Sequence, residues 1–523
     1  MLKKVFWGAG LFLLVASLLL AAFFFVTENR VIYEGDELAV TIELPALFTI
    51  MPPEKTERTV ENTIDESHRV HIELFGAKVG FVDITERTLG NGSTFLFERF
   101  ENNSWLFFPA TVVVSGLEDP EFTSWNPAII EHEYHDVFGM DPTVNPFGTL
   151  KSSDFELLQS NVYVSKKMQT DYDDGTSSHL RKLSKEVRDL EISGNTLVKK
   201  FWLQPLQLAE SWAMISEKPL FSSTASEEEW IDHSLNNQTV QLNWLTTDGP
   251  YTKLPFSIEP SSKMGYGRAI GRFEDDEALR WNQKDPSAFH ETMILNSRVN
   301  LLYYLAEFDG SRWPTEYTST WLKNAYEVTA PYVDTRYNEY VAFYLDETAK
   351  LYDDQIEQND LAVETYADYL LTQINAEQTL PTASGFLIVD YFDEDDQTPL
   401  THASLNHELG GLKILLQAYG DTENKDYLEA AESVTSGIEE FCQDAGGWIR
   451  ENGDLWYQAR PDGTFSGDDY PQLTLLDLLE TQLLLEKLGM ERNAYFDDMI
   501  DSKLLYLEEE NIELIEKVTI LME

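Results

Sequence analysis

The sequence predicts an α+β protein in which an N-terminal transmembrane anchor precedes a small β-sandwich and a larger (α/α) helical toroid. An uncharged apolar run lies near the N-terminus, apolar residues then alternate up to about residue 125, and the apolar period becomes helical from about residue 178. We therefore expect three domains: the anchor at 1–29, a β-rich domain with an irregular connection at 30–165, and the toroid at 166–523.

The anchor is predicted by the run from Val5 to Val26, which contains no charged residue and follows Lys3 and Lys4. At about 1.5 Å rise per residue, a helix of this length crosses a hydrocarbon core of about 30 Å. The run is longer than the apolar region of a cleaved signal peptide, and Phe23-Phe24-Phe25 is a poor cleavage context. We expect a single-pass cell-membrane protein with residues 5–26 in the bilayer and the bulk of the chain outside the cytoplasm.

Charge and composition restrict the function classes. The 523-residue chain has 91 acidic residues against 38 Lys plus Arg, so its formal net charge is −53. Such a chain repels phosphate backbones, which argues against a nucleic-acid partner. The sequence contains Cys442 as its one cysteine, so no internal disulfide is expected. No cofactor is expected, although so acidic a surface is compatible with a structural divalent cation such as Ca²⁺.

The β-rich domain is predicted by period-two alternation. The apolar positions of its first segments are Val31, Tyr33, Leu38, Val40, Ile42, Val70, Ile72 and Leu74. Gly76 and Gly80 then indicate a turn or bulge, and Asn102-Asn103 is suited to a hairpin connection. Several short strands with turn signals favour a β-sandwich. The proline-rich residues 127–165 are expected to be irregular.

The toroid is predicted by segments with helical periodicity. These segments are 178–192, 201–216, 225–236, 287–308, 316–329, 335–352, 360–376, 403–419, 424–442, 471–488 and 492–520. They follow one another in pairs without a strict sequence repeat, which favours about six helical hairpins over a four-helix bundle.

The segment THASLNHELGG, residues 401–411, begins a helix and carries His402 and His407. The helix is apolar on two sides, which is typical of an interior position in a double-layered assembly. At 100° per residue the two histidines lie about 140° apart, so a regular helix cannot direct both at one metal ion. Two interpretations remain: histidines hydrogen-bonded in the core, or polar groups lining a cavity.

Four residues in the loop-rich segment that starts at 446 are suited to sugar chemistry. Trp448 and Trp456 are flat surfaces for stacking on sugar rings, while Tyr457 and Arg460 add a phenol and a fixed cation. The alternative is that these aromatic residues belong to the core.

Asp468, Asp469 and Tyr470 stand just before a Leu-rich helix. They are placed where loops meet the beginning of a helix, which is where a toroid gathers its active-site residues. The alternative is that one aspartate caps the helix.

The segment 334–348 carries tyrosines at helical spacing together with Arg336, Tyr337 and Glu339. The residues near the helix start are candidates for a cleft, and the tyrosine stripe otherwise belongs to the core. The pair His132 and His135 in EHEYHD imitates a zinc-protease pattern but has the wrong spacing, so no metal site is expected there.

Two of these motifs resemble the glucuronyl C5-epimerases. DLWY, residues 454–457, is similar to the family's Trp-Tyr motif, and DDYPQLTLLDLL, residues 468–479, is similar to its Asp-Tyr pair ahead of a late Leu-rich helix. The resemblance implies an N-terminal β region, a C-terminal (α/α) barrel and a membrane anchor. It also implies that Tyr457 and Tyr470 exchange protons at the sugar C5 while Arg460 holds the carboxylate.

The expected function is that of a membrane-anchored extracytoplasmic enzyme of epimerase or lyase type that acts on polysaccharide. The expected catalytic residues are Tyr457, Tyr470, Arg460, His407 and Asp469, and the expected substrate-binding residues are Trp448, Trp456, Arg336, Tyr337, Glu339 and His402. One alternative is a non-catalytic surface protein that binds or assembles glycan. Another is a glycoside hydrolase, whose two carboxylates would come from Asp469 with Glu339 or from Asp468 with Glu408.

Overall fold

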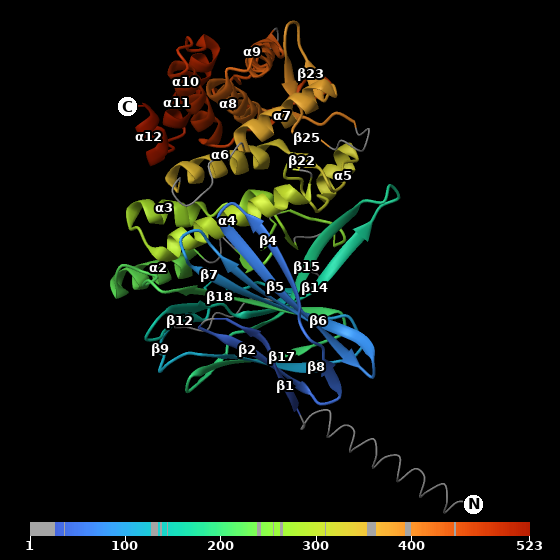
Figure 1. Ribbon diagram of the computed structural model, residues 1–523. Coiled ribbons are helices and arrows are strands. Elements are labelled where there is room, and N and C mark those ends of the chain that lie inside the picture. The colour runs from blue at the N-terminus through green and yellow to red at the C-terminus, as the bar shows by residue number, and fades with distance from the viewer. Residues whose placement is uncertain are drawn as a thin grey trace, which may run out of the picture. The chain divides into compact units, whose positions relative to one another are not determined.

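The computed structural model describes most of the chain (Figure 1). The described residues are 27–35, 37–126, 134–135, 139–143, 145–237, 242–254, 256–261, 265–308, 310–352, 362–392, 399–443 and 446–522, with only the backbone at 134–135. They form two compact units. Unit 1 contains the residues up to Thr170, His179–Arg268 and Asp275–Asn300, and unit 2 contains Asp171–Ser178, Ala269–Glu274 and Leu301–Glu523.

Unit 1 consists mainly of two sheets, whose strands pair antiparallel apart from one short parallel contact in the larger sheet. The five-stranded sheet runs in the order β1 (Thr27–Glu34), β2 (Ala39–Pro45), β8 (Phe108–Ser115), β17 (Thr196–Leu203) and β16 (Glu191–Ser193). The main path of the larger sheet is β19 (Asn243–Thr246), β20 (Gly249–Lys253), β21 (Tyr266–Gly267), β15 (Ser177–Val187), β14 (Val162–Asp171), β18 (Gln207–Ser216), β7 (Thr94–Asn102), β6 (Ala77–Thr88), β5 (Thr63–Leu74) and β3 (Phe48–Ile50). Beside this path lie β4 (Glu54–Val60), β9 (Glu121–Ser124), β10 (Tyr134–His135), β11 (Gly139–Met140), β12 (Gly148–Lys151) and β13 (Glu156–Gln159). The helices α2 (Thr224–Asn237), α3 (Asp276–Lys284) and the first part of α4 (Ala288–Glu307) complete the unit.

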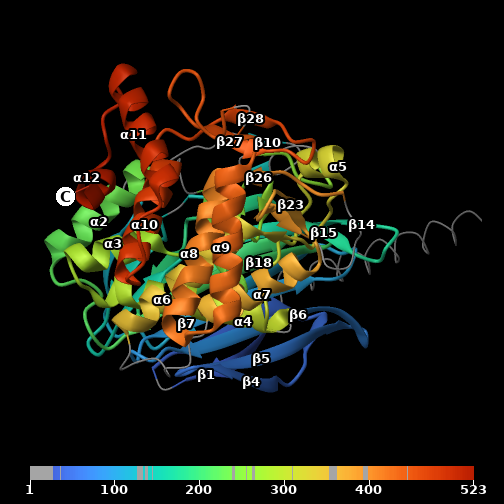
Figure 2. The same ribbon diagram turned by 90° about the horizontal axis from the view of Figure 1, so that it is seen from above.

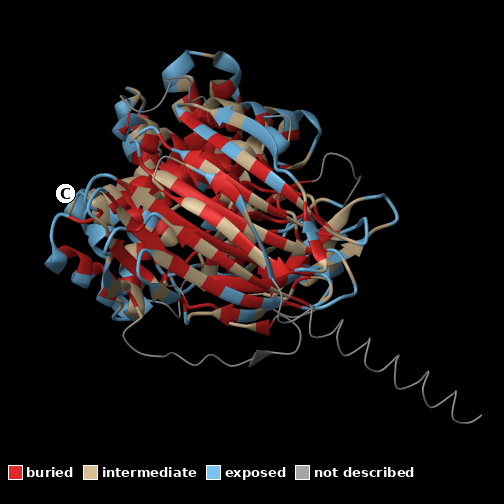
Figure 3. Cartoon of the chain, turned by 60° about the horizontal axis from the view of Figure 1, so that its bottom comes forward, coloured by how far each residue is buried: buried red, intermediate tan, exposed pale blue. Residues whose placement is uncertain are grey.

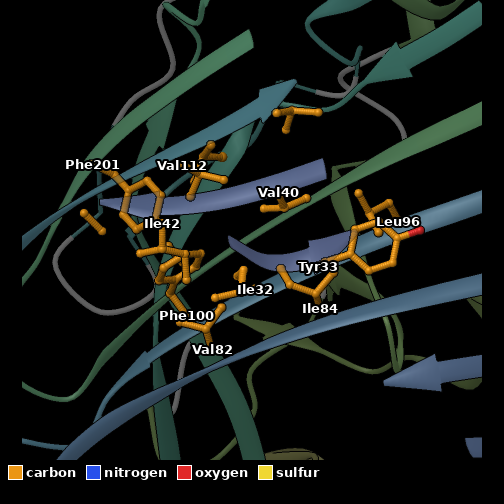
Figure 4. Packing of buried hydrophobic residues seen from close by; sticks show 14 of the residues in the cluster. Ile32, Tyr33, Val40, Ile42, Val82, Ile84, Leu96, Phe100, Val112 and Phe201 are labelled. Carbon is orange, nitrogen blue, oxygen red and sulfur yellow. The ribbon is translucent and has the colours of Figure 1, made fainter. Parts of the chain in front are cut away.

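One apolar core joins the inner faces of the two sheets, as in a β-sandwich. Val40, Ile42 and Val112 from the five-stranded sheet pack with Val82 and Phe100 from the larger sheet (Figure 4). The alternation in the sequence produces this core because successive side chains of a strand point to opposite faces. Figure 3 shows the result as buried residues running along the strands.

The predicted fold class is wrong about the size of the β region. The segments 178–192 and 201–216, expected to be helices, form β15, β17 and β18, so strands continue as far as Gly267. Strand β18, QLAESWAMIS, is buried on both faces, and a strand of this kind does not alternate clearly in sequence. Part of the segment 127–165, expected to be irregular, also forms strands.

The predicted hairpin at Asn102-Asn103 is wrong as well. The strands on either side of it, β7 and β8, belong to different sheets, so they do not pair with each other. Asn102 instead ties this connection together, because its Nδ2 donates to Leu106 O at 2.7 Å and to Gln204 O at 2.9 Å. The turn predicted at Gly76 is confirmed: it has a positive φ of 81° and joins β5 to β6.

The predicted N-terminal anchor receives no support. Residues 5–26 lie outside the described residues. Within the described part of the chain, no helix combines the length and apolar character needed to cross a bilayer. The prediction of a single-pass membrane protein is therefore not supported.

Unit 2 is mainly helical. Its helices are the end of α4, α5 (Thr320–Tyr326), α6 (Thr335–Leu351), α7 (Ala362–Asn375), α8 (Leu405–Thr422), α9 (Lys425–Glu440), α10 (Leu473–Lys487), α11 (Ala494–Glu509) and α12 (Glu516–Met522), with a short 3-10 turn η1 (Ile270–Arg272). Short strands connect them: β22 (Val333–Asp334), β23 (Thr379–Pro381), β24 (Phe386–Ile388), β25 (Tyr391–Phe392), β26 (Ala403–Ser404), β27 (Trp456–Ala459) and β28 (Phe465–Asp468).

The helices of unit 2 form two rows. Helix α8 packs between α6 and α10, while α7 and α9 pack on α8 and on each other, and α11 packs on α10 (Figure 2). This alternation agrees with the predicted toroid pattern, but the helices of the described residues form three such hairpins instead of about six. Helix α8 is buried on almost every side, which agrees with the prediction that it lies in the interior.

Candidate functional site

The candidate site is formed where α6 and α8 begin. Asp334 of β22 is the N-cap of α6 and accepts hydrogen bonds from the backbone N–H groups of Arg336 and Tyr337 at 3.0 and 3.2 Å. Ser404 of β26 is the N-cap of α8, but its side chain makes no capping bond. Its hydroxyl and backbone N–H both donate to the carboxylate of Asp390 instead, which fixes that carboxylate beside both helix starts.

Asp390 lies between two histidines. Its Oδ2 is 3.1 Å from Nε2 of His402, and its Oδ1 is 3.6 Å from Nδ1 of His407. With its proton on Nε2, His402 donates to Asp390 and accepts at Nδ1 from the Tyr326 hydroxyl at 3.2 Å. Nδ1 of His407 is also 2.8 Å from the Thr335 hydroxyl. The spacing along the helix suggested divergent histidines, but the carboxylate brings them together because His402 precedes the regular part of α8.

The protonation states follow from burial. Burial lowers the pKa of His407 to about 4, and the nearby Asp390 carboxylate only partly opposes this. Burial alone would raise the pKa of Asp390, but the two histidines and the hydrogen bond from the Ser404 hydroxyl together outweigh that effect, and the pKa is lowered. At neutral pH the array therefore holds an ionised carboxylate and a neutral His407. The carboxylate favours the His407 proton on Nδ1, so Nε2, which bonds to no residue in the described ranges, carries the lone pair.

Asp334 is a second carboxyl close to Asp390, and its pKa moves in the opposite direction. Burial raises the pKa of Asp334 to about 7, and the negative charge of Asp390 adds to the increase. The strands that carry them are adjacent, since Asp334 pairs with Tyr391 across β22 and β25. The site thus contains a carboxylic acid and a carboxylate whose pKa values are moved apart.

Aromatic side chains surround the His402 ring. The rings of Trp321, Tyr326 and Tyr391 have centroids 5.6, 5.6 and 5.7 Å from it. Trp321 is half exposed, so the group reaches from a buried histidine to the surface. Arg460, which is exposed, lies near enough to Tyr326 to lower its pKa against the larger opposing effect of burial.

The two tyrosines predicted to be catalytic lie together. The Tyr457 and Tyr470 rings meet edge to face with centroids 5.5 Å apart, and Tyr470 is 49% exposed. Burial raises the pKa of Tyr457, and the negative charge of Asp390 raises it further. Tyr457 therefore keeps its proton at neutral pH. Tyr337 packs on Gly271 of η1, and burial raises its pKa too.

Arg336 and Glu339 belong to a buried ionic cluster. Arg336 donates to Glu339 at 2.6 Å and to both carboxylate oxygens of Asp477 at 3.1 and 2.9 Å. Lys413 of α8 joins them at 2.9 Å from Asp477 and 3.3 Å from Glu339. These contacts connect α6, α8 and α10 beneath the site, so Arg336 and Glu339 are engaged with protein groups.

The remaining predicted residues have other surroundings. Trp448 is completely buried, with its indole N–H donating to Ile438 O at 3.1 Å, so the core alternative describes it. Trp456 stacks on Phe465 at 6.1 Å and carries the Arg450 guanidinium over its ring. Asp469 is paired with a lysine and with Thr474.

The sequence patterns did not single out five residues of the site, namely Asp334, Asp390, Trp321, Tyr326 and Tyr391. A signal was present for two of them. Asp390 directly follows the apolar run of β24, where a strand ends, and Asp334 is an N-cap residue at the start of a clear helical period. The aromatic residues had no such signal, because only the tertiary fold brings α5 and β25 to the histidines.

No metal centre is found in the described ranges, where no group of three or more His, Cys, Asp and Glu side chains is arranged to hold an ion. His132 and the side chain of His135 lie outside those ranges.

Comparisons with known proteins give no family assignment. No family model matches the sequence, and no curated protein matches it. Among solved structures, D-mannose isomerase is similar at 13% identity and a TM-score of 0.32, over 46% of this chain and 58% of that one. The unsaturated glucuronyl hydrolase of Bacillus sp. GL1 has 13% identity and a TM-score of 0.32, over 49% and 62%. The cellobiose 2-epimerase of Spirochaeta thermophila DSM 6192 has 14% identity and a TM-score of 0.28, over 47% and 51%. This chain thus spans less than two thirds of each, and TM-scores this low establish neither a shared fold nor a shared activity.

Proposed function

We propose that the protein is a carbohydrate-active enzyme that transfers a proton at a sugar carbon, as an epimerase or lyase does. The observation that carries the proposal is the neutral His407, held beside the ionised Asp390 at the start of α8. A neutral imidazole accepts a proton, and an adjacent carboxylate stabilises the imidazolium that results. The half-buried and exposed aromatic rings next to this array supply faces for a sugar ring.

The chemistry would proceed from the His407 side of the substrate. Nε2 removes the proton from a carbon next to a carbonyl or carboxylate group, and the electron pair of the broken C–H bond moves onto the neighbouring oxygen. Tyr457, which keeps its proton, donates a hydrogen bond to that oxygen or returns a proton to the carbon, and Arg460 holds a substrate carboxylate. Return of a proton to the opposite face gives the epimer. If the electron pair instead forms a double bond to the adjacent carbon and expels its glycosidic oxygen, which takes a proton from Tyr457, the lyase product results.

Solvent exchange tests this proposal. The full chain is incubated in D₂O with a panel of acidic and neutral polysaccharides, and deuterium at the sugar carbons is measured by NMR. We expect deuterium to enter one carbon position if the enzyme is an epimerase, or an unsaturated sugar to form if it is a lyase, and His407→Gln to abolish either product. The matched control is His290→Gln, because His290 is also buried with a pKa lowered to about 4 but belongs to unit 1. Equal incorporation by both variants would contradict the assignment of His407 as the base.

A glycoside hydrolase is the second candidate, and the carboxyl pair Asp334 and Asp390 favours it. A carboxylic acid and a carboxylate kept in opposite states are what glycoside hydrolysis requires. The same incubation separates the candidates, because hydrolysis releases reducing ends with neither deuterium at carbon nor the unsaturated sugar that a lyase leaves. Binding without either product would instead support the glycan-binding alternative.

A further inference from the structure

The hairpin formed by β27 and β28 carries three of the candidate site residues. Trp456 and Tyr457 lie on β27, and Tyr470 follows directly after β28 and Asp469. The hairpin joins the site through β26, because Ser404 pairs with Gln458. Its orientation therefore determines where the Tyr457 and Tyr470 rings stand relative to Ser404 and Asp390.

Both ends of this hairpin are bound by one buried ammonium group. Lys503 of α11 is completely buried and donates to Asp454, just before β27, and to Asp469 Oδ2 at 2.8 Å, just after β28. The neighbouring Ser502 hydroxyl donates to Gly453 O at 2.8 Å. A single side chain from a different helix thus closes the base of the hairpin.

The contacts of Asp469 occupy both of its carboxylate oxygens. Its Oδ2 accepts from Lys503, and its Oδ1 accepts from the Thr474 hydroxyl in the first turn of α10. Both oxygens are engaged inside the protein, and the side chain is almost completely buried. These contacts agree with a role in holding the chain and not with a role as general acid or base.

We infer that Lys503, with Asp454 and Asp469, is a positioning device that holds the β27–β28 hairpin so that Tyr457 and Tyr470 stand at the sugar site. We call this group of three residues the Lys503 clasp. Its structural part depends only on the contacts above, and its catalytic part rests on the proposed function. Loss of one partner should loosen the hairpin and slow turnover by displacing Tyr457 and Tyr470, while proton transfer at His407 keeps its pH dependence.

The variants are Asp469→Asn and Asp454→Asn, each of which removes one carboxylate while Lys503 keeps the other. The matched control is Tyr495→Phe. Tyr495 also lies on α11 and also binds this region, since its hydroxyl accepts from the Trp448 backbone N–H at 2.9 Å, but that contact lies before the hairpin.

The first measurement is amide hydrogen exchange in the full chain, which needs no substrate. We expect exchange within residues 455–470 to accelerate by about tenfold or more in both Asn variants, with α8 unchanged, and to stay near wild type in the control. Unchanged exchange in the Asn variants, or an equal change in the control, would overturn the clasp.

The second measurement is steady-state kinetics on a polysaccharide turned over by the wild type. We expect kcat to fall several-fold in Asp469→Asn, because Tyr457 is held less firmly at the substrate, with both limbs of the pH profile preserved. A lost kcat with a missing limb would make Asp469 a catalytic residue and overturn the positioning role. If the wild type transforms no sugar, the proposed function fails, and the exchange result still decides whether the clasp holds the hairpin.

Discussion

Nε2 of His402 lies 3.1 Å from Oδ2 of Asp390, and neither residue is more than 1% exposed. The carboxylate is the common partner of His402, His407 and Ser404, so its charge organises the whole array. We expect Asp390→Asn to abolish turnover, because an amide cannot stabilise the imidazolium of His407. Loss of a buried acceptor should also lower the free energy of unfolding by about 1–3 kcal/mol.

Urea denaturation measures the change in stability, and deuterium incorporation into the sugar in D₂O measures the loss of turnover. The control is Asp368→Asn, since Asp368 is exposed and accepts one hydrogen bond from Tyr427 at 2.6 Å. We expect the control to change the free energy of unfolding by less than about 0.5 kcal/mol and to leave turnover intact. An active Asp390→Asn variant would remove Asp390 from the mechanism.

His407→Gln should change how stability depends on pH. The pKa of His407 is about 4 in the folded chain, below its ordinary value of about 6.5, so between these values the unfolded chain binds the proton and the folded chain does not. Stability therefore rises with pH across this window, with a slope of up to about 1.4 kcal/mol per pH unit from this residue. The difference between wild type and variant in urea denaturation should grow from pH 4 to pH 6.5. If the free energies of unfolding of wild type and variant instead change in parallel with pH, His407 is not held neutral by the fold.

Asp334→Asn should change the pH dependence of stability in the opposite direction to His407→Gln. The folded pKa of Asp334, about 7, lies above its ordinary value of about 3.9, so between these values the folded chain holds a proton that the unfolded chain has released. Its contribution to stability is complete below about pH 4 and is lost as pH rises through 7. Asparagine is also a good N-cap, so α6 should remain intact. The variant should therefore gain stability relative to wild type as pH rises, and a constant difference would contradict the raised pKa.

The helices of unit 2 and part of the site could be predicted from local patterns, but the arrangement of the strands could not. The segment 403–419 has a clear helical period, and it forms α8 with two buried sides as predicted. Strand β18 is a clear example of an arrangement that could not be predicted, because its partner Thr94–Asn102 lies about a hundred residues earlier in the sequence. Local periodicity contains no information about such partners.

The site shows the same limit. His402 and His407 were identified from their residue type, whereas Asp390 stands in a different loop and is connected to them only in the folded chain. The same holds for Arg336, whose residue type suggested substrate binding. Its position in the folded chain gives it Glu339 and Asp477 as partners.

Tyr470→Phe separates a role in turnover from a role in packing. Tyr470 is 49% exposed and meets Tyr457 through its ring, which phenylalanine preserves. We expect turnover of a uronate polymer to be lost while the free energy of unfolding changes by less than about 0.5 kcal/mol, as at other surface sites. Thermal unfolding followed by circular dichroism checks the second part. A large fall in the thermal midpoint would instead make Tyr470 a core residue.

Gly410→Ala tests whether the buried ionic cluster requires a glycine at this position of α8, where the cluster occupies the space of a side chain. A Cβ at position 410 would overlap Oε2 of Glu339 and come within 2.9 Å of Nη1 of Arg336, both held by their ion pair. Overpacking of this kind costs about 1–3 kcal/mol, which exceeds the gain of up to about 1 kcal/mol from replacing glycine inside a helix. The adjacent Gly411→Ala is the matched control, because its Cβ would meet Leu370 Cδ1 at an ordinary 3.8 Å. In urea denaturation Gly410→Ala should be destabilised and Gly411→Ala stabilised. Stabilisation of both would mean that Glu339 and Arg336 move aside freely and that the cluster does not fix the spacing of α6 and α8.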